Sequence, residues 1–376
     1  MDISLQKTIV FLFFILIGVL LKVKFQSKEE LSGIKKIILN LALPATIFIA
    51  LLGIKVELHL LLLPLFALGL NILLFLAMPL LLPLMGIQKK SPEYRTARLL
   101  VPSLAPGLSC FPFVLEFLGE PFLAKAAMAD LGNKFFVLIC LYFVAMGWHY
   151  NLQSKQFEKG VAKAIPMLKA MVSEPVNIFI GVALLLLTFG LTKDSLPFFL
   201  SETLEKLSLI MTPLVLLFIG LAVKIKRKQF FQIFSLLCVR AGLVLLIGAG
   251  FVALAGVQTP GNILLILAFG LSACSFWPYA HIAVVDGLEM DASPREKTFN
   301  SDFGIAILAL SFPLSTMLIL GVLNSGSFFF STFNIFAAAG LLLSVGLLIP
   351  IIGGINKKLT EQKLLSPKFK SAAENV

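Results

Sequence analysis

Residues Ser103–Pro112 read Ser-Leu-Ala-Pro-Gly-Leu-Ser-Cys-Phe-Pro, and they interrupt an otherwise apolar run that is typical of a helix. Pro102 stands directly before this stretch, and Pro106, Gly107 and Pro112 lie within it. A proline inside a helix removes a hydrogen bond and clashes with the carbonyl four residues earlier. In a bilayer such a break is tolerated only where protein or a water-filled cavity satisfies the freed backbone groups. The stretch therefore predicts a broken membrane helix.

A second stretch, Ser275-Phe-Trp-Pro-Tyr-Ala-His281, repeats the Ser-x-x-Pro arrangement of Ser103 and Pro106 after 172 residues. The sequences Asp130-Leu-Gly and Asp302-Phe-Gly are separated by the same 172 residues. Two independent matches at one offset indicate that the chain consists of two related halves, and that each half carries one broken helix.

The composition places the whole chain in a membrane. The 376 residues are 59% hydrophobic and only 14% charged, whereas soluble domains have about 25% charged residues. The net charge of +11 comes from basic residues that cluster between apolar runs. This is a positive-inside pattern rather than a nucleic-acid-binding face. The four cysteines lie in apolar runs without metal-ligand spacing, and we expect neither a metal site nor a cofactor.

Apolar runs near the length of about 20 residues that a membrane helix needs occur eleven times in the sequence. The first run, which follows Lys7 and lacks a cleavage site, is interpreted as a membrane span rather than a signal peptide. The predicted spans are 8–21, 37–54, 58–86, 97–118, 124–148, 175–192, 204–223, 230–257, 261–285, 302–323 and 328–354.

Basic residues follow the odd-numbered spans, as in the segments with Lys22 and Lys24, Lys89 and Lys90, and the carboxy-terminal tail. The intervening segments have few or balanced charges. This alternation predicts an amino terminus outside, a carboxy terminus in the cytoplasm and a multi-pass protein of the plasma (inner) membrane. An odd number of spans agrees with termini on opposite sides.

Under this interpretation, the group of spans one to five starts from the outside of the membrane, whereas the group of spans six to ten starts from the inside. Two five-span groups of opposite orientation are the layout of an inverted repeat. Pro44 in span two matches Pro213 in span seven, in support of the repeat. The predicted fold is an all-α polytopic membrane protein with two inverted five-helix repeats, broken crossing helices in spans four and nine, and one extra carboxy-terminal helix. We predict a first repeat at 1–150, a cytoplasmic linker at 151–174, a second repeat at 175–325, and the extra helix with a basic tail at 326–376.

Crossing breaks bring half-helix ends together near the middle of the bilayer. The second half of each broken helix offers free N–H groups and a positive dipole end to an anion. Carbonyls at the end of each first half suit a cation or a proton-bearing group. A simple kink packed by neighbouring helices is the structural alternative. The predicted substrate-binding residues are Ser103, Pro106, Gly107, Ser109, Ser275, Pro278, His281 and Lys134, with Ser272 as a further hydroxyl.

Asp130, Asn133 and Lys134 form the most informative polar cluster. Only about 14 apolar residues separate Lys134 from His149, too few for a span, so span five must carry the cluster into the membrane. Ionisable residues there are costly and usually functional, although Asp130 and Lys134 can also form an i,i+4 ion pair that only neutralises itself. We predict that Asp130, Asn133, Asn300 and Asp302 take part in ion or proton coupling.

Three of these predictions have structural alternatives. Asp302 precedes a full apolar span, so an interfacial position is an alternative for it and for Asn300. His281 either exchanges a proton or bonds a backbone carbonyl. Arg240, about 11 residues into span eight, either snorkels to the inner face, pairs with an acid or contacts substrate.

These features together resemble those of the auxin efflux carrier family of membrane transport proteins, over spans one to ten. The resemblance rests on the order of several short motifs rather than on any one of them. They are Leu-Ala-Leu-Pro44, Pro-Gly-Leu-Ser-Cys-Phe-Pro112, Gly119-Glu-Pro, Ala-Asp130-Leu-Gly-Asn133, Thr-Pro213 through Ile219-Gly220, and Gly287-Leu-Glu-Met-Asp291.

The resemblance implies a secondary transporter with a scaffold part and a transport part that cross at the prolines, and an organic anion, such as a carboxylate, as substrate. Sodium–bile acid symporters share the architecture. Two departures stand out: Ala105 occupies a position where the family often has asparagine, and Cys110 occupies that of a second glycine. The eleventh span is also additional to the usual ten.

The function that we expect is therefore secondary active transport of a small organic anion by alternating access, with H⁺ or Na⁺ as a coupling ion where one is used. The partners are the anion and the lipid bilayer, with no nucleic acid, and a homodimer is one assembly that the fold allows. A sodium-coupled symporter and a non-transporting receptor with a carrier fold are the alternatives. An intramembrane enzyme has little support, because the sequence shows no paired aspartates, Ser/His dyad or His-rich metal motif.

Overall fold

The computed structural model describes residues 3–25, 27–53, 60, 62–152, 169, 172–222, 229–289 and 297–365. Side chains within residues 3–5, at 28, 222 and 349, and within 351–365 are not part of that description. Most of the predicted linker 151–174, the end of the basic tail, and Met290 and Asp291 of the last family motif lie outside the described residues.

The described residues form helices joined by turns and short irregular segments, and contain no β-strand. The chain is therefore an all-α protein, as the sequence predicts. The helices are α1 (Ile3–Leu21), α2 (Lys28–Ile37), α3 (Leu43–Leu52), α4 (Leu63–Leu84), α5 (Pro92–Leu100), α6 (Pro106–Ser109), α7 (Phe111–Leu118), α8 (Glu120–Phe135), α9 (Leu141–Leu152), α11 (Pro175–Thr188), α12 (Phe198–Leu209), α13 (Met211–Ala222), α14 (Phe230–Leu254), α15 (Pro260–Gly270), α16 (Phe276–Leu288), α17 (Ser301–Leu323) and α18 (Thr332–Leu365). Two π-helical segments, Ile38–Ala42 and Phe136–Cys140, join α2 to α3 and α8 to α9, and 3₁₀ turns occur at Lys193–Ser195 and Phe328–Phe330.

Six helical stretches in the described chain are long and apolar enough to cross a membrane. Four shorter apolar helices accompany them: Gln6–Leu21, Pro175–Thr188, Pro260–Gly270 and Thr332–Leu348. Nine of the eleven predicted spans coincide with one of these helices; the two broken spans coincide with series of helices, span four with α5, α6 and α7, and span nine with α15 and α16. The prediction of a polytopic membrane protein is confirmed, whereas the inverted relation of the two halves stays a prediction.

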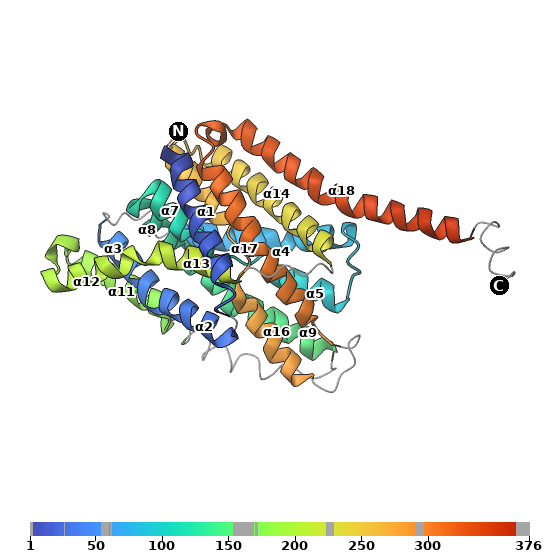
Figure 1. The fold of residues 1–376 in the computed structure, drawn as a ribbon, viewed down its shortest axis with the longest axis horizontal. Helices are drawn as coiled ribbons and strands as arrows, with labels where there is room; N and C mark the ends of the chain where they lie inside the picture. Colours follow the sequence, from blue (N-terminus) through green and yellow to red (C-terminus); the bar gives the residue numbers. More distant parts are fainter. Residues whose placement is uncertain are drawn as a thin grey trace.

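The helices pack as two layers. The small layer consists of α1, α2, α3, α11, α12 and α13, in which α1 contacts α13, α2 contacts α13, and α3 contacts α11 and α12. The large layer consists of α4 to α9 and α14 to α17, in which α4 contacts α8, α5 contacts α17, and α9 contacts α16. Contacts of α3 with α8 and of α13 with α7 join the two layers. Figure 1 shows α3, α11 and α12 grouped together to one side of the molecule.

Both predicted helix breaks are present in the large layer. Residues 101–105 separate α5 from α6, and residues 271–275 separate α15 from α16. Pro106 is the first residue of α6, and a proline disfavours helical backbone at the residue before it. Pro278 lies in the first turn of α16, where the backbone N–H that it lacks would have no partner within the helix. Its ring clashes with a helical carbonyl four residues earlier, so α16 cannot continue towards its amino-terminal side. Each proline thus ends helical structure on its amino-terminal side.

The second half of span four differs from a single helix. It consists of the short α6 and of α7, which are separated at Cys110. Pro112 is the second residue of α7, so it cannot donate the hydrogen bond that would continue α6 into α7. The predicted half-helix is therefore split, and only α16 presents a full helix amino terminus at the crossing.

The extra helix α18 packs along α14, and Figure 1 shows its carboxy-terminal part extending beyond the other helices. The two helices approach closely at glycines: a Cβ on Gly242 would lie 2.7 Å from Cγ of Leu343, and one on Gly346 would lie 2.6 Å from Cγ2 of Val239. Ser235 also donates its hydroxyl to the Gly346 carbonyl. This contact fixes the outer side of α14.

Candidate functional site

The two helix breaks are hydrogen-bonded directly to each other. The Ala105 N–H donates to the Ala273 carbonyl at 2.8 Å. The Ser275 N–H donates to Oγ of Ser103 at 2.9 Å, and the Ala273 N–H donates to Oγ of Ser109 at 2.9 Å. Backbone groups that helix formation leaves free are thus satisfied across the crossing, and both serine hydroxyls are used to join the breaks.

Asn133, on α8, supplies the first break with its remaining hydrogen bonds. Its Oδ1 accepts from the Leu104 N–H at 3.2 Å, and its Nδ2 donates to the Leu104 carbonyl at 3.0 Å. The same side chain accepts from Nδ2 of Asn71 at 3.0 Å and donates to Oδ1 of Asp130 at 2.8 Å. The two N–H donors and the two acceptor positions of the amide are all in use. Asn133 therefore bonds both the N–H and the carbonyl of Leu104, as the backbone of a neighbouring β-strand would.

Arg240, on α14, contacts both breaks from another side. Its Nε donates to the Val101 carbonyl at 2.8 Å, and its Nη2 donates to the carbonyls of Ser103 at 3.2 Å and Ser272 at 2.7 Å. The side chain is only 4% exposed. Arg240 therefore does not snorkel to a surface, and among the described residues it forms no ion pair.

Two serines of α17 bond further backbone groups of the second break. The Cys274 N–H donates to Oγ of Ser311 at 3.3 Å, and Oγ of Ser315 donates to the Leu271 carbonyl. The second break is thus held by hydroxyl groups of α17, whereas the first is held by an amide of α8. The crossing is therefore held by hydrogen bonds between the two breaks and from α8, α14 and α17, which a local kink within one helix would not require.

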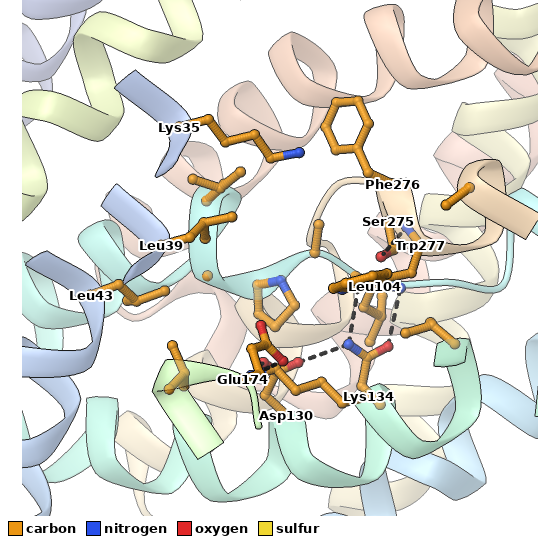
Figure 2. Close-up of a pocket in the computed structure, with 18 residues that line it drawn as sticks. Lys35, Leu39, Leu43, Leu104, Asp130, Lys134, Glu174, Ser275, Phe276 and Trp277 are labelled. Atoms are coloured by element: carbon orange, nitrogen blue, oxygen red, sulfur yellow. Dashed lines mark hydrogen bonds and ion pairs between the residues drawn. The ribbon is translucent and has the colours of Figure 1, made fainter. Parts of the chain in front are cut away.

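A cavity of about 270 Å³ lies beside the crossing, between the small and the large layer (Figure 2). Three of the elements around it, α2, α3 and the start of α11, belong to the small layer, and the others belong to the large layer. Its lining residues are Lys35, Leu39, Leu43, Leu104, Ala105, Pro106, Gly107, Leu108, Asp130, Asn133, Lys134, Val137, Glu174, Val176, Ser275, Phe276, Trp277 and Ala280.

Charged side chains lie on two opposite sides of this cavity, as Figure 2 shows. On one side, Nζ of Lys134 lies 3.2 Å from Oε2 of Glu174 and 3.7 Å from Oδ2 of Asp130, and donates to Oδ1 of Asn177 at 2.9 Å. On the other side, Nζ of Lys35 lies 4.0 Å from the centroid of the Phe276 ring, in a cation–π contact.

The two lysines differ in their partners. Lys134 has two carboxylates and is neutralised within the protein, whereas the ion pairs of the described chain include none that involves Lys35. Lys35 also lies beside the amino terminus of α16, whose N-cap is Ser275. The side of the cavity with Lys35 is therefore the one suited to an anion.

The predicted site residues divide into two groups. Those that line the cavity are Pro106, Gly107, Asp130, Asn133, Lys134 and Ser275. Those that do not are Ser103, Ser109, Pro278, His281, Asn300 and Asp302. Their predicted parts in binding or coupling stay predictions.

The residues outside the cavity have identifiable contacts. Nε2 of His281 lies 2.8 Å from the Val137 carbonyl in the second π-helical segment. Asn300 caps the start of α17, with its Oδ1 accepting from the Phe303 N–H at 2.9 Å and its Nδ2 donating to Oε1 of Glu93 at 2.7 Å. Asp302, in the first turn of α17, is exposed. The contact of His281 with a backbone carbonyl is the one stated as its alternative, whereas an interfacial position of Asn300 and Asp302 stays an alternative.

Sequence reasoning missed Lys35 and Glu174 as site residues. From the sequence, Lys35 belongs to the basic segment that follows span one with Lys22 and Lys24, and Glu174 is the last residue of the predicted linker 151–174. The available signal for Lys35 was its position less than three turns before Pro44 on an amphipathic stretch. No signal in the sequence links Glu174 to Lys134, because that contact depends on the packing of α11 against α8.

A second cavity of about 620 Å³ lies between α4, α8, α14 and α15. It is lined almost entirely by apolar side chains, and its one charged group, Lys125, donates to Oδ1 of Asn262 at 3.0 Å. It shares no lining residue with the cavity at the crossing. Within the described chain no group of three or more His, Cys, Asp and Glu side chains is placed to hold a metal ion.

Fold and site together define a polytopic membrane protein in which two broken helices cross beside a small, charged cavity between two layers. No family model matches the chain. The chain is similar to a protein of Methanocaldococcus jannaschii that is named as an uncharacterized transporter. The two are 28% identical over 238 residues, which are 61% of this chain and 71% of the relative.

Proposed function

We propose that the protein is a secondary transporter of a small organic anion, with the cavity at the crossing as the binding site. The observation that carries this proposal is the position of Lys35, a cation without an acidic partner in the described chain, beside the amino terminus of α16. The similarity to a protein named as a transporter supports the general class. The resemblance to the auxin efflux carriers supports the choice of a carboxylate.

The cavity suits a small solute. Its volume of about 270 Å³ lies just below the range of roughly 300–1,000 Å³ that is common for drug-sized ligands. A carboxylate of the substrate would lie between Nζ of Lys35 and the first turn of α16. The apolar part of a small organic acid would contact Leu39 and Leu43, which line the same cavity.

The location of the cavity between two layers supports alternating access. Relative movement of the layers would close the cavity on one side and open it on the other, because the lining residues come from both. In the predicted orientation, with the amino terminus outside, α2 and α11 would begin at the cytoplasmic side, and we propose that the cavity with Lys35 and Glu174 is reached from there.

Flux measurements with purified protein in liposomes test this proposal. We expect uptake of at least one labelled mono- or dicarboxylate from a panel tested under imposed proton and sodium gradients. Lys35→Gln should raise the KM for that substrate about tenfold, which corresponds to the loss of roughly 1.4 kcal/mol of interaction. The fold should be retained, because Lys35 makes no ion pair with another described residue.

Lys36→Gln is the matched control. It removes the same charge from the next position of α2, but Lys36 is exposed and does not line the cavity. Its KM should equal that of the unmodified protein. A broad panel that gives neither flux nor a change in melting temperature would contradict the proposal, and so would equal effects of the two substitutions.

A further inference from the structure

The ends of α5 and α15 bring many carbonyl groups together at the crossing. The last carbonyls of a helix have no partner within that helix, and they form the negative end of its dipole. In transporters with broken helices, such carbonyl ends commonly hold a coupling cation. Two such ends that meet inside a membrane protein can be stabilised by a bound ion or by a positive group of the protein, in addition to neutral hydrogen-bond donors.

In this chain the positive group is Arg240. Its guanidinium bonds the Val101 and Ser103 carbonyls of the first break and the Ser272 carbonyl of the second, at 2.8, 3.2 and 2.7 Å. A guanidinium is planar and offers five N–H donors, so one side chain can serve carbonyls that belong to two helices. Since the ion pairs of the described residues do not include Arg240, its charge is balanced by carbonyl dipoles rather than by a carboxylate.

The neighbouring carbonyls also have protein donors. Oγ of Ser103 donates to the Leu100 carbonyl at 2.6 Å. Oγ of Ser272 donates to the Phe269 carbonyl, and Oγ of Ser315 donates to the Leu271 carbonyl. Six carbonyl oxygens around the crossing, those of Leu100, Val101, Ser103, Phe269, Leu271 and Ser272, thus accept hydrogen bonds from side chains of the protein, in a place where a metal cation would need carbonyl ligands.

We propose that Arg240 is a built-in cation that occupies the place of a coupling metal ion at the crossing, so that substrate movement does not depend on sodium. This inference rests on the proposed transport function. It distinguishes a sodium-independent carrier from the alternative, a sodium-coupled symporter. Arg240 is a positioning residue: it holds the two breaks together, and the substrate lies in the cavity on the other side of them.

Chemical rescue of Arg240→Ala tests the inference. The substitution should lower the melting temperature of the purified protein. Low-millimolar guanidinium chloride should then restore at least half of that loss, because the free cation can occupy the space of the missing side chain. Urea at the same concentration has a similar shape and N–H donors but no charge, and it should restore little.

Leu237→Ala is the matched control, since Leu237 is buried one turn earlier on the same helix α14. Guanidinium should not raise its melting temperature. Equal recovery with urea, or equal recovery of both variants with guanidinium, would overturn the assignment of a cation site.

The unmodified protein gives an independent test that does not depend on the folding of a variant. Its melting temperature and its carboxylate flux should be the same when sodium chloride is replaced by choline chloride. A saturable dependence of either quantity on sodium would overturn the inference. If liposomes show no flux at all, the proposed function fails, while the two melting experiments still decide the role of Arg240.

Discussion

The amide side chain of Asn133 satisfies the backbone hydrogen-bonding groups of Leu104 in the first helix break, as a neighbouring β-strand would. It bonds both the N–H and the carbonyl of Leu104, and it also bonds Asn71 and Asp130. Unpaired backbone groups are expensive inside a membrane protein. The stability of the crossing should therefore depend on Asn133 more than on any single apolar contact around it.

Asn133→Ala should lower the free energy of unfolding by about 2 kcal/mol or more, because it leaves buried polar groups of Leu104 without partners. The change can be measured as a fall in melting temperature in detergent. Asn334→Ala removes the same amide from a half-buried residue whose single bond, to the Phe328 carbonyl, is exposed to solvent, and it should have little effect. Equal shifts for the two variants would contradict the role of Asn133.

The charges around Lys134 give a second prediction at the residue scale. Lys134→Gln leaves Asp130 and Glu174 without their shared cation, and should cost about 2 kcal/mol of stability. This is less than for a fully buried pair, because Glu174 is partly exposed. Adding Glu174→Gln removes the surplus carboxylate and should recover part of the loss. A double variant that melts lower than Lys134→Gln would show that Glu174 stabilises the site without Lys134.

At the scale of elements, α1 and α13 of the small layer cross in close contact. A Cβ on Gly18 would lie 2.3 Å from the Leu217 carbonyl oxygen, and one on Gly220 would lie 2.1 Å from the Ile15 carbonyl oxygen. Small residues permit such close approach of membrane helices. The two glycines therefore set the distance between α1 and α13.

Gly220→Ala should separate α1 from α13 and lower stability by about 1–3 kcal/mol, the usual cost of overpacking. Thermal melting in detergent measures it. Gly181→Ala, on α11 in the same layer, is the control, because a Cβ there meets no other atom within 4 Å. If Gly220→Ala melts like the control, the close contact does not limit this helix pair.

The sequence predicts where helices break better than it predicts which residues bond the broken ends. The breaks beside Pro106 and Pro278 were predictable because proline acts locally on its own helix. The use of Ser103 and Ser109 to bond the opposite break was not, because it depends on how two distant segments cross. Arg240 illustrates the same limit: its position suggested snorkelling, pairing or substrate contact, whereas its partners are carbonyls of residues more than 30 positions away along the chain.

The site was predictable in part for the same reason. Asp130, Asn133 and Lys134 stood out as polar residues that a short apolar segment must carry into the membrane. Lys35 did not stand out, because a lysine near the end of a span is expected to reach the polar surface. Only the three-dimensional structure shows that its ammonium group contacts the Phe276 ring at the edge of the cavity.

At the scale of the whole molecule, the two layers are joined by ion pairs as well as by helix packing. Nζ of Lys7, on α1, lies 3.2 Å from Oε1 of Glu116, on α7, and thus joins the small layer to the large one. The cavity with Lys35 and Glu174 also lies between the layers. A carrier that works by relative movement of these layers must break the first contact when the cavity changes its access.

A reversible cross-link tests this movement. In a protein without its native cysteines, Lys7→Cys and Glu116→Cys joined by a cleavable bis-methanethiosulfonate should abolish flux, and a reductant should restore it. The control pair is Lys193→Cys with Glu205→Cys, which replaces a 3.1 Å ion pair within the small layer and should leave flux unchanged. Full activity of the joined Lys7–Glu116 pair would exclude relative movement of α1 and α7 during transport.

The guanidinium at the crossing has one more consequence, which concerns the membrane potential. A metal ion can leave such a site after transport, but the charge of Arg240 is covalently attached, so in a carrier whose large layer moves across the membrane it would have to travel back with the empty protein. Moving one elementary charge through a potential of 100 mV is worth about 2.3 kcal/mol. Voltage would therefore act on the return step even when no substrate is bound, and a voltage jump should produce a transient current that Arg240→Ala reduces.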